Sequence, residues 1–253
     1  MNSITISIVS AGCIFSGTLV GFWLQKRLPG HHLGKDSHEI VKLGAGMIAT
    51  LTALVLGLLV SSAKGTFDTI NAGIKQMSAR IVLTDRLLAQ YGPETRAVRE
   101  QIKASLVAGM ETVWPQNGAE FVVKTSAGRT NRMDSVQVRL RELTPQTEAQ
   151  RQLLAQAQQI AADISQNRWL MFEEAQNQLP VPLLVILVFW LTTLFLSFGL
   201  FAPRNATVAV VLFVCACSVA TAIFLILEMN RPLEGFVKVS NAPLRDALEQ
   251  LGH

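Results

Sequence analysis

The segment that decides the fold is Val41–Asp68, VKLGAGMIATLTALVLGLLVSSAKGTFD. From Leu43 to Ala63 it contains no charged residue. A helix rises ~1.5 Å per residue, so about 20 apolar residues are enough to cross the hydrocarbon core of a bilayer. The segment therefore predicts a membrane-spanning helix that continues into polar sequence at its carboxyl end.

Two stripes of side chains with four-residue spacing run along this helix. The first contains only small residues, which let helix backbones approach closely in lipid. We therefore expect the first stripe to contact another helix, and the second to form a neighbouring face. Both stripes are also compatible with ordinary packing in a helix bundle. The first consists of Ala45, Ala49, Ala53 and Gly57, and the second of Gly46, Thr50, Leu54 and Leu58.

The composition indicates a mixture of membrane helices and a soluble portion. Of the 253 residues, 50% are hydrophobic and 16% are charged, which is too apolar for an average soluble domain and too polar for a protein buried entirely in lipid. The net charge of +4 comes without a dense Lys/Arg run, so nothing indicates nucleic acid binding. Cys13, Cys215 and Cys217 lie in apolar segments without metal-type spacing or a disulfide framework.

Three further segments have the length and composition of spanning helices: Ile4–Leu24, Leu183–Phe201 and Ala206–Leu227. The first contains Gly17-x-x-x-Gly21, a helix-contact spacing. No positive side chain precedes it, so we interpret it as an anchor and not as a cleaved signal. Four spans place both termini and the middle of the chain on one side of the membrane. Basic residues are nearly balanced between the two sides, and the absence of an export signal before the middle domain favours the cytoplasm.

The expected fold class is all-α: a polytopic membrane protein with four transmembrane helices and a cytoplasmic helical domain between helices 2 and 3. Residues 1–63 would hold the first two spans, 64–178 the helical domain, 179–229 the last two spans, and 230–253 a cytoplasmic tail.

The polar middle region predicts a series of helices separated by Gly and Pro. Tyr91-Gly92-Pro93 ends the first helix, and Thr144-Pro145 resembles a helix start, with Thr as the cap. A coiled-coil-like seam is expected on the last helix at Leu153, Ala157, Ile160 and Ile164. The expected elements are helices over Phe67–Gln90 and Pro93–Trp114, a loop over Pro115–Thr130, a helix resuming around Asp134, and a helix from Thr144 to about Gln178.

Sequence motifs for catalysis are missing. There is no nucleophile elbow, phosphate loop, zinc helix or pair of catalytic carboxylates, so we do not expect an enzyme, a cofactor or a metal site. The spans carry no ionisable side chain at mid-depth, which argues against a proton pump or ion-coupled transporter. Glu228, at the end of the fourth span, is either a helix-terminal interfacial residue or an ion site. His31, His32 and His38 are interpreted as part of a solvated loop over Leu28–Ile40.

Three stretches together carry a family resemblance. They are Leu54-Val55-Leu56-Gly57-Leu58 running on to Phe67-Asp68, then EMNRPLEG at Glu228–Gly235, then VSNAPL at Val239–Leu244. With the order of two spans, helical insert, two spans and tail, they resemble the bestrophin-like family of bacterial four-helix membrane proteins. The tail motif residues of this resemblance are Glu228, Asn230, Pro232 and Gly235.

The second span also resembles the pore helix of true bestrophins, which are pentameric anion channels with a neck of large apolar residues. Matching Leu56-Gly57-Leu58 to their Leu-Gly-Phe sequence places the neck on Thr50, Leu54 and Leu58. Lys64 would then stand at the pore mouth, or alternatively would be an interfacial residue whose side chain reaches toward the lipid headgroups. The chain departs from true bestrophins in three places. The neck lacks aromatic residues, and Phe236-Val237-Lys238 replaces the acidic calcium-sensing cluster. In the tail, Arg231 separates Asn230 from Pro232, Leu233 replaces Phe and Glu234 precedes Gly235, where bestrophins have Asn-Pro-Phe-Gly.

The resemblance implies a bestrophin-like homo-oligomeric ion channel, with a pentamer as one form and anions as the expected ions. It implies an integral protein of the bacterial inner membrane whose middle domain and both termini are cytoplasmic. Its partners would be the lipid bilayer, copies of itself and inorganic ions. The alternative is a non-conducting membrane scaffold or sensor that binds a partner through its cytoplasmic helical domain.

Overall fold

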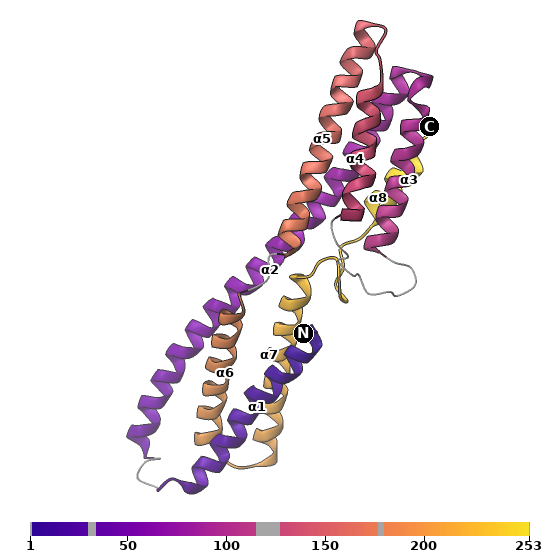
Figure 1. Cartoon of the computed structure of the whole chain (residues 1–253). Helices are drawn as coiled ribbons and strands as arrows, with labels where there is room; N and C mark the ends of the chain where they lie inside the picture. Colours follow the sequence, from indigo (N-terminus) through magenta and orange to yellow (C-terminus); the bar gives the residue numbers. More distant parts are fainter. Residues whose placement is uncertain (1, 30–33, 115–126, 177–179, 253) are drawn as a thin grey trace. The chain divides into compact units, whose positions relative to one another are not determined.

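The computed structural model describes residues 2–29, 34–114, 127–176 and 180–252 (Figure 1). The regular elements in these ranges are all helices. They form two compact units. The first unit comprises Met1–Gly65 and Gln178–Asn230, and the second comprises Thr66–Asn177 and Arg231–His253.

Within the described ranges, four helices are long and apolar enough to cross a membrane. They are α1 (Ser3–Arg27), the apolar part of α2 (Lys35–Tyr91), α6 (Val181–Phe201) and α7 (Ala206–Met229). Their presence confirms the expected all-helical class with four apolar helices.

The predicted loop over Leu28–Ile40 is too long, because α2 already begins at Lys35. His38 therefore lies in a helix, with its ring centroid 4.7 Å from that of Phe201. His31 and His32 lie outside the described residues.

Helices α1 and α6 of the first unit approach each other closely. A Cβ built on Gly17 would lie 2.5 Å from the Thr192 carbonyl oxygen, and one built on Gly21 would meet the Leu196 carbonyl. From the other side, a Cβ on Gly199 would meet the Thr18 carbonyl. Only glycine fits where two backbones approach this closely. The contact confirms the helix-contact role predicted for Gly17-x-x-x-Gly21.

Helix α7 packs on the same α1 helix. The ring of Phe15 meets that of Phe213 edge-on, with centroids 5.2 Å apart. The core of the first unit draws apolar side chains from all four helices, among them Ile14, Leu59, Leu187 and Ile223.

Helix α2 is continuous over 57 residues and passes from the first unit to the second between Gly65 and Thr66. In its polar part, Ile70, Ile74, Ile81 and Leu88 are buried in the core of the second unit. The helix ends at Tyr91, where Gly92 adopts φ +141° and the 3-10 turn η2 (Pro93–Thr95) follows. This confirms the break predicted at Tyr91-Gly92-Pro93.

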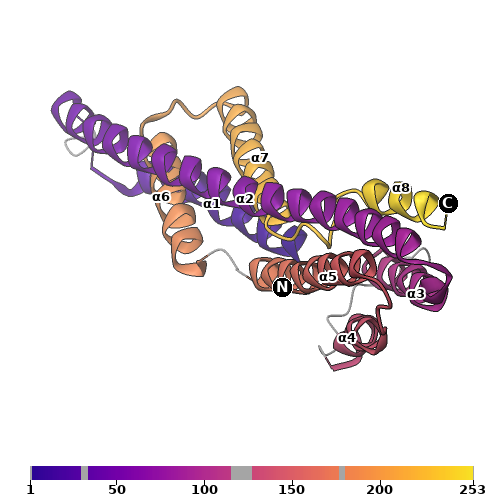
Figure 2. The same ribbon diagram turned by 90° about the horizontal axis from the view of Figure 1, so that it is seen from above.

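The second unit is completed by α3 (Arg96–Val113), α4 (Ala127–Glu142), α5 (Glu148–Gln176) and α8 (Ala242–Gln250). Helix α5 runs alongside the polar part of α2 (Figures 1 and 2). The predicted seam on α5 is confirmed as its core-facing side. Ala157 and Ile164 are buried, and Leu153 and Ile160 pack half-buried against the core.

Two predicted helix starts are wrong. Helix α5 begins at Glu148 and not at Thr144, because the hydroxyl of Thr147 accepts the backbone N–H of Gln150 and so caps the helix three residues later than expected. Helix α4 begins at Ala127 and not near Asp134. Its Gly128 costs only about 1 kcal/mol relative to alanine inside a helix, so it does not force a loop there.

Candidate pore-lining helix

The apolar part of α2 has one face turned toward its own bundle. Thr52, Leu59 and Ala63 are buried on this face, and the Thr52 hydroxyl donates to the Ile48 carbonyl at 2.7 Å. Val55 is half-buried and packs against the same core. Helices α1, α6 and α7 supply the other residues of that core, so this face of α2 is held by its own chain.

The three predicted neck residues lie together on the opposite face. Thr50 is exposed, and Leu54 and Leu58 are 62% and 61% exposed. The Thr50 hydroxyl donates to the Met47 carbonyl at 2.8 Å, which satisfies it within the helix. The neck residues therefore share one outward stripe that no other helix of the described chain covers.

The predicted small-residue stripe winds from the packed face to the exposed one. Ala45 packs half-buried against the core, whereas Ala49, Ala53 and Gly57 are exposed. A Cβ built on Gly57 would meet nothing within 4 Å. Each four-residue step turns about 40° around the helix, since 3.6 residues make a full turn. Within a single chain, only the Ala45 end of the stripe is used for packing.

Charged residues appear on α2 just beyond the apolar segment. Lys64 is exposed, and Asp68 is exposed one turn later. This i,i+4 spacing is one at which opposite charges attract along a helix. The candidate pore-mouth residue thus has a carboxylate nearby on the same helix.

The tail motif forms a structured turn. Glu228 and Asn230 are buried at the end of α7, where the Asn230 N–H donates to the Ile226 carbonyl at 3.1 Å. Pro232 is fully buried, and its carbonyl accepts the Val239 N–H at 2.8 Å. Gly235 adopts φ +77°, which a glycine reaches without strain. We name residues 232–239 the tail loop.

After the tail loop, the chain joins the core of the second unit. The Trp114 indole N–H donates to the Val239 carbonyl at 3.0 Å, and the Ser78 hydroxyl donates to the Pro243 carbonyl. Leu244 and Ala247 of α8 are buried. The tail motif predicts a turn at Pro232 and Gly235 that returns the tail onto the helical domain, whereas the short helix α8 has no clear signal in the sequence.

A buried ion pair also escaped prediction. Asp85 accepts two hydrogen bonds from Arg99, at 2.7 Å from Nε and 2.8 Å from Nη2. The Gly252 N–H donates to the same carboxylate at 3.3 Å. The hydrogen bonds from Arg99 to Asp85 raise the pKa of the Arg99 guanidinium, against the opposing effect of burial. A signal was present in the sequence, because Asp85 occupies the helical register of the buried residues Ile81 and Leu88.

No cluster of three or more His, Cys, Asp or Glu side chains suited to a metal ion occurs within the described ranges.

Four apolar helices joined to a helical second unit define the class: an all-helical membrane protein. Within this class, the chain belongs to the bestrophin-like family, because the family model of the Bestrophin-like domain matches residues 12–244. This match confirms the predicted family. Neither a curated protein nor a solved structure matches the chain.

Proposed function

We propose that the protein is a bestrophin-like oligomeric ion channel in which α2 lines the pore. The observation that carries this proposal is the bare outer face of α2. Only 11% of the most apolar stretch of α2 is buried within the chain, against 22–33% for the other three apolar helices. The exposed stripe holds Thr50, Leu54 and Leu58, the residues that the resemblance to bestrophins assigns to the neck.

A pore requires several copies of this face. One helix cannot enclose a path, whereas cyclic symmetry brings the same face of every subunit around one axis. The small residues Ala49, Ala53 and Gly57 flank the neck stripe and would let neighbouring α2 helices approach closely. Membership of the bestrophin-like family supports a homo-oligomer, with a pentamer as the expected form.

The neck would gate by its apolar surface. Rings of leucine narrow enough to exclude water resist ion passage without any charge, and widening or wetting them permits it. Beyond the neck, Lys64 would place a positive charge near the mouth and favour anions, while Asp68 one turn later would moderate that preference. We propose anions as the conducted ions and no enzymatic activity.

The proposed location is the bacterial inner membrane, with the second unit and both termini in the cytoplasm. The four apolar helices support a membrane location. The partners would be lipid, copies of the chain and inorganic ions.

Planar-bilayer recording of the purified protein tests the channel. The double variant Leu54→Ala/Leu58→Ala should conduct more than the wild type, or conduct where the wild type is silent, because the smaller side chains widen and wet the ring. Val55→Ala, on the face packed against the bundle, and Leu225→Ala, exposed on α7, are the controls and should leave conductance unchanged.

Cysteine accessibility gives a second measurement at the same site. A cysteine at position 54 should react with a water-soluble thiol reagent in the open state, and one at position 55 should not. Equal conductance in all variants, or labelling at 55 without labelling at 54, would refute the assignment of α2 to the pore.

The second candidate function is a non-conducting scaffold or sensor. It is favoured by two large apolar side chains on the outer side of α5, Trp169 and Leu170, which are 52% and 59% exposed. Exposed aromatic residues often anchor protein partners. A protein that stays silent in every variant, yet loses a partner when Trp169 is changed to Ser, would support the scaffold over the channel.

A further inference from the structure

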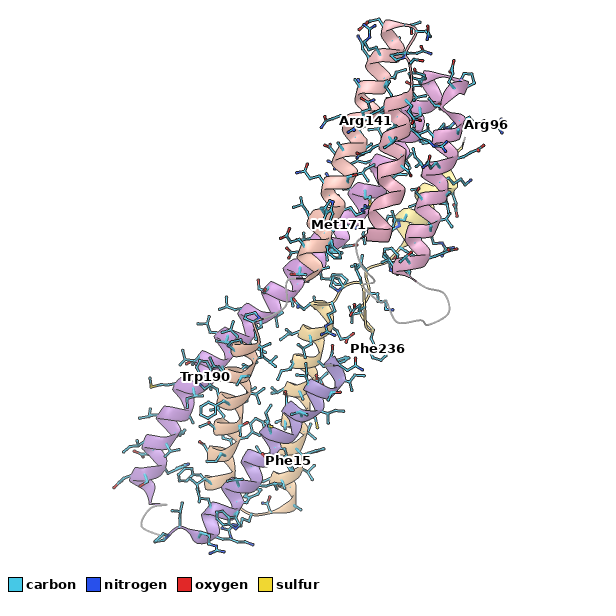
Figure 3. The ribbon with its side chains drawn as sticks, viewed as in Figure 1. Phe15, Arg96, Arg141, Met171, Trp190 and Phe236 are labelled. Atoms are coloured by element: carbon cyan, nitrogen blue, oxygen red, sulfur yellow. The ribbon has the colours of Figure 1, made fainter. Side chains whose placement is uncertain are left out.

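We propose that the tail loop is an anchor to the membrane surface: Phe236 inserts among anionic lipid headgroups, and Arg231 and Lys238 provide the charge that holds it there. This proposal does not depend on ion conduction or on the number of subunits. The first observation is exposure. Phe236 is 76% exposed, more than any other large hydrophobic side chain among the described residues. It projects from the tail loop in Figure 3.

Both ends of the tail loop are fixed, so its exposed tip at Phe236 is held in place. The N–H of Val239 donates to the Pro232 carbonyl at 2.8 Å, and both residues are buried in the second unit. Gly235 turns the chain with φ +77°, immediately before Phe236. A hydrophobic ring presented by a closed loop needs little additional ordering to reach a surface.

Covalent continuity limits how far the tip can lie from the end of α7. Phe236 follows Met229, the last residue of α7, by seven residues. A chain spans at most about 3.5 Å per residue, so the two lie within about 25 Å of each other in any arrangement of the two units. Helix α7 has 24 residues and at ~1.5 Å each reaches the headgroup region if it crosses a bilayer. The tip is therefore within reach of the same leaflet.

The charges around Phe236 suit a negatively charged surface. Arg231 and Lys238 are exposed on either side of the tip, and Glu234 is half-buried. The turn between Arg231 and Glu234 is closed by the Glu234 N–H, which donates to the Arg231 carbonyl at 3.0 Å. An aromatic residue flanked by cations is the combination that binds the interface of anionic membranes.

Spin labelling of the full-length protein in vesicles tests the anchor. Cys13, Cys215 and Cys217 are replaced by Ala, and a nitroxide label is placed at position 236. Labels at Val138, exposed on α4, and at Leu225, exposed on α7, serve as the water and lipid references. The measured quantity is the ratio of accessibility to oxygen, which enters lipid, over accessibility to a water-soluble nickel chelate.

In vesicles containing phosphatidylglycerol, the ratio at position 236 should be several-fold above that at 138 and approach that at 225. It should fall toward the value at 138 in pure phosphatidylcholine. Lys238→Gln should lower the ratio of docked to undocked loop by about fivefold, since one cation near an anionic surface is worth that much.

Two results would overturn the proposal. A ratio at position 236 equal to that at 138 in both kinds of vesicle means that the loop stays in water. Low accessibility to both reagents, unchanged by lipid composition, means that a protein surface such as a second copy of the chain covers Phe236. Neither result depends on whether the protein conducts ions.

Discussion

At the scale of single residues, the charge of Asp85 is compensated inside the second unit. The carboxylate is 2% exposed and bound in bidentate fashion by Arg99. The pKa of Arg99 is higher in the folded state than in the unfolded chain. The stabilisation that the Arg99–Asp85 pair gives the folded state is therefore fully present below the ordinary pKa of arginine. It is lost only as the pH rises through the still higher folded value, so it does not vary across the neutral range.

Arg99→Ala should lower the free energy of unfolding of the second unit by about 3 kcal/mol, because it leaves a buried carboxylate without its counter-charge. Thermal unfolding in detergent, followed with hydrogen exchange of the amides near Gly252, measures the loss. Arg96→Ala is the matched control. Its pair with Glu100 is exposed at both ends, and it should change stability by less than about 1 kcal/mol. Equal losses in the two variants would contradict the role given to Asp85.

The glycine of the tail loop is the second residue whose backbone matters. Gly235→Ala should destabilise the loop by about 1 kcal/mol, because alanine resists a φ of +77°. Limited proteolysis should then release the tail faster than in the wild type. Gly109→Ala, in an exposed position inside α3 with open space around it, should instead be neutral or stabilising. Unchanged cleavage of the Gly235 variant would make the tail motif a linker.

At the scale of helices, the close contact between α1 and α6 requires glycine, which has no side chain, where the two backbones meet. Gly21→Ala should lower the melting temperature of the detergent-solubilised protein, since its methyl group would overlap the Leu196 carbonyl and cost about 1–3 kcal/mol. Gly12→Ala on the same helix, with nothing within 4 Å, is the control. A Gly21 variant as stable as the Gly12 variant would contradict the close contact.

For Gly57 on helix α2 we expect the opposite effect on the packing of a single chain. Gly57→Leu adds a side chain where the single chain leaves open space, so it should not disturb the bundle of one subunit. It should instead overpack the contact between subunits and reduce the oligomer, as measured by light scattering of the purified protein. A variant with wild-type oligomer size and melting temperature would place the stripe against lipid.

The apolar helices could be predicted from the sequence because their length is set by the bilayer. Short elements could not. The nine residues of α8 are too few for a clear periodicity, and the true cap of α5 is Thr147, three residues after a Thr-Pro pair that looks equally suitable. Four-residue spacing grouped Thr50, Leu54 and Leu58 correctly on one face, but spacing alone does not say whether a face packs inward or stays exposed.

At the scale of the whole molecule, the candidate pore would form only when several copies of the chain assemble. One chain supplies a helix with a packed face and a bare face, and the interactions of the bare face lie outside that chain. Conductance and cysteine labelling of the assembled protein therefore test whether this face lines a pore. Periodicity in a single sequence identifies a face, whereas the symmetry that would close it into a path leaves no trace in that sequence.

The second unit is assembled from two separate stretches of chain, residues 66–177 and 231–253. Between them come α6 and α7, so the ribosome adds the last two apolar helices before it reaches Val239 and Leu244, which complete the core. At roughly 5–20 residues per second, this interval lasts several seconds. During it, the parts of α2 and α3 that the tail covers remain open to chaperones and proteases. The core of the second unit therefore cannot be completed before both later helices have been made, and a chain interrupted before Val239 would leave exposed the apolar side chains that the tail covers.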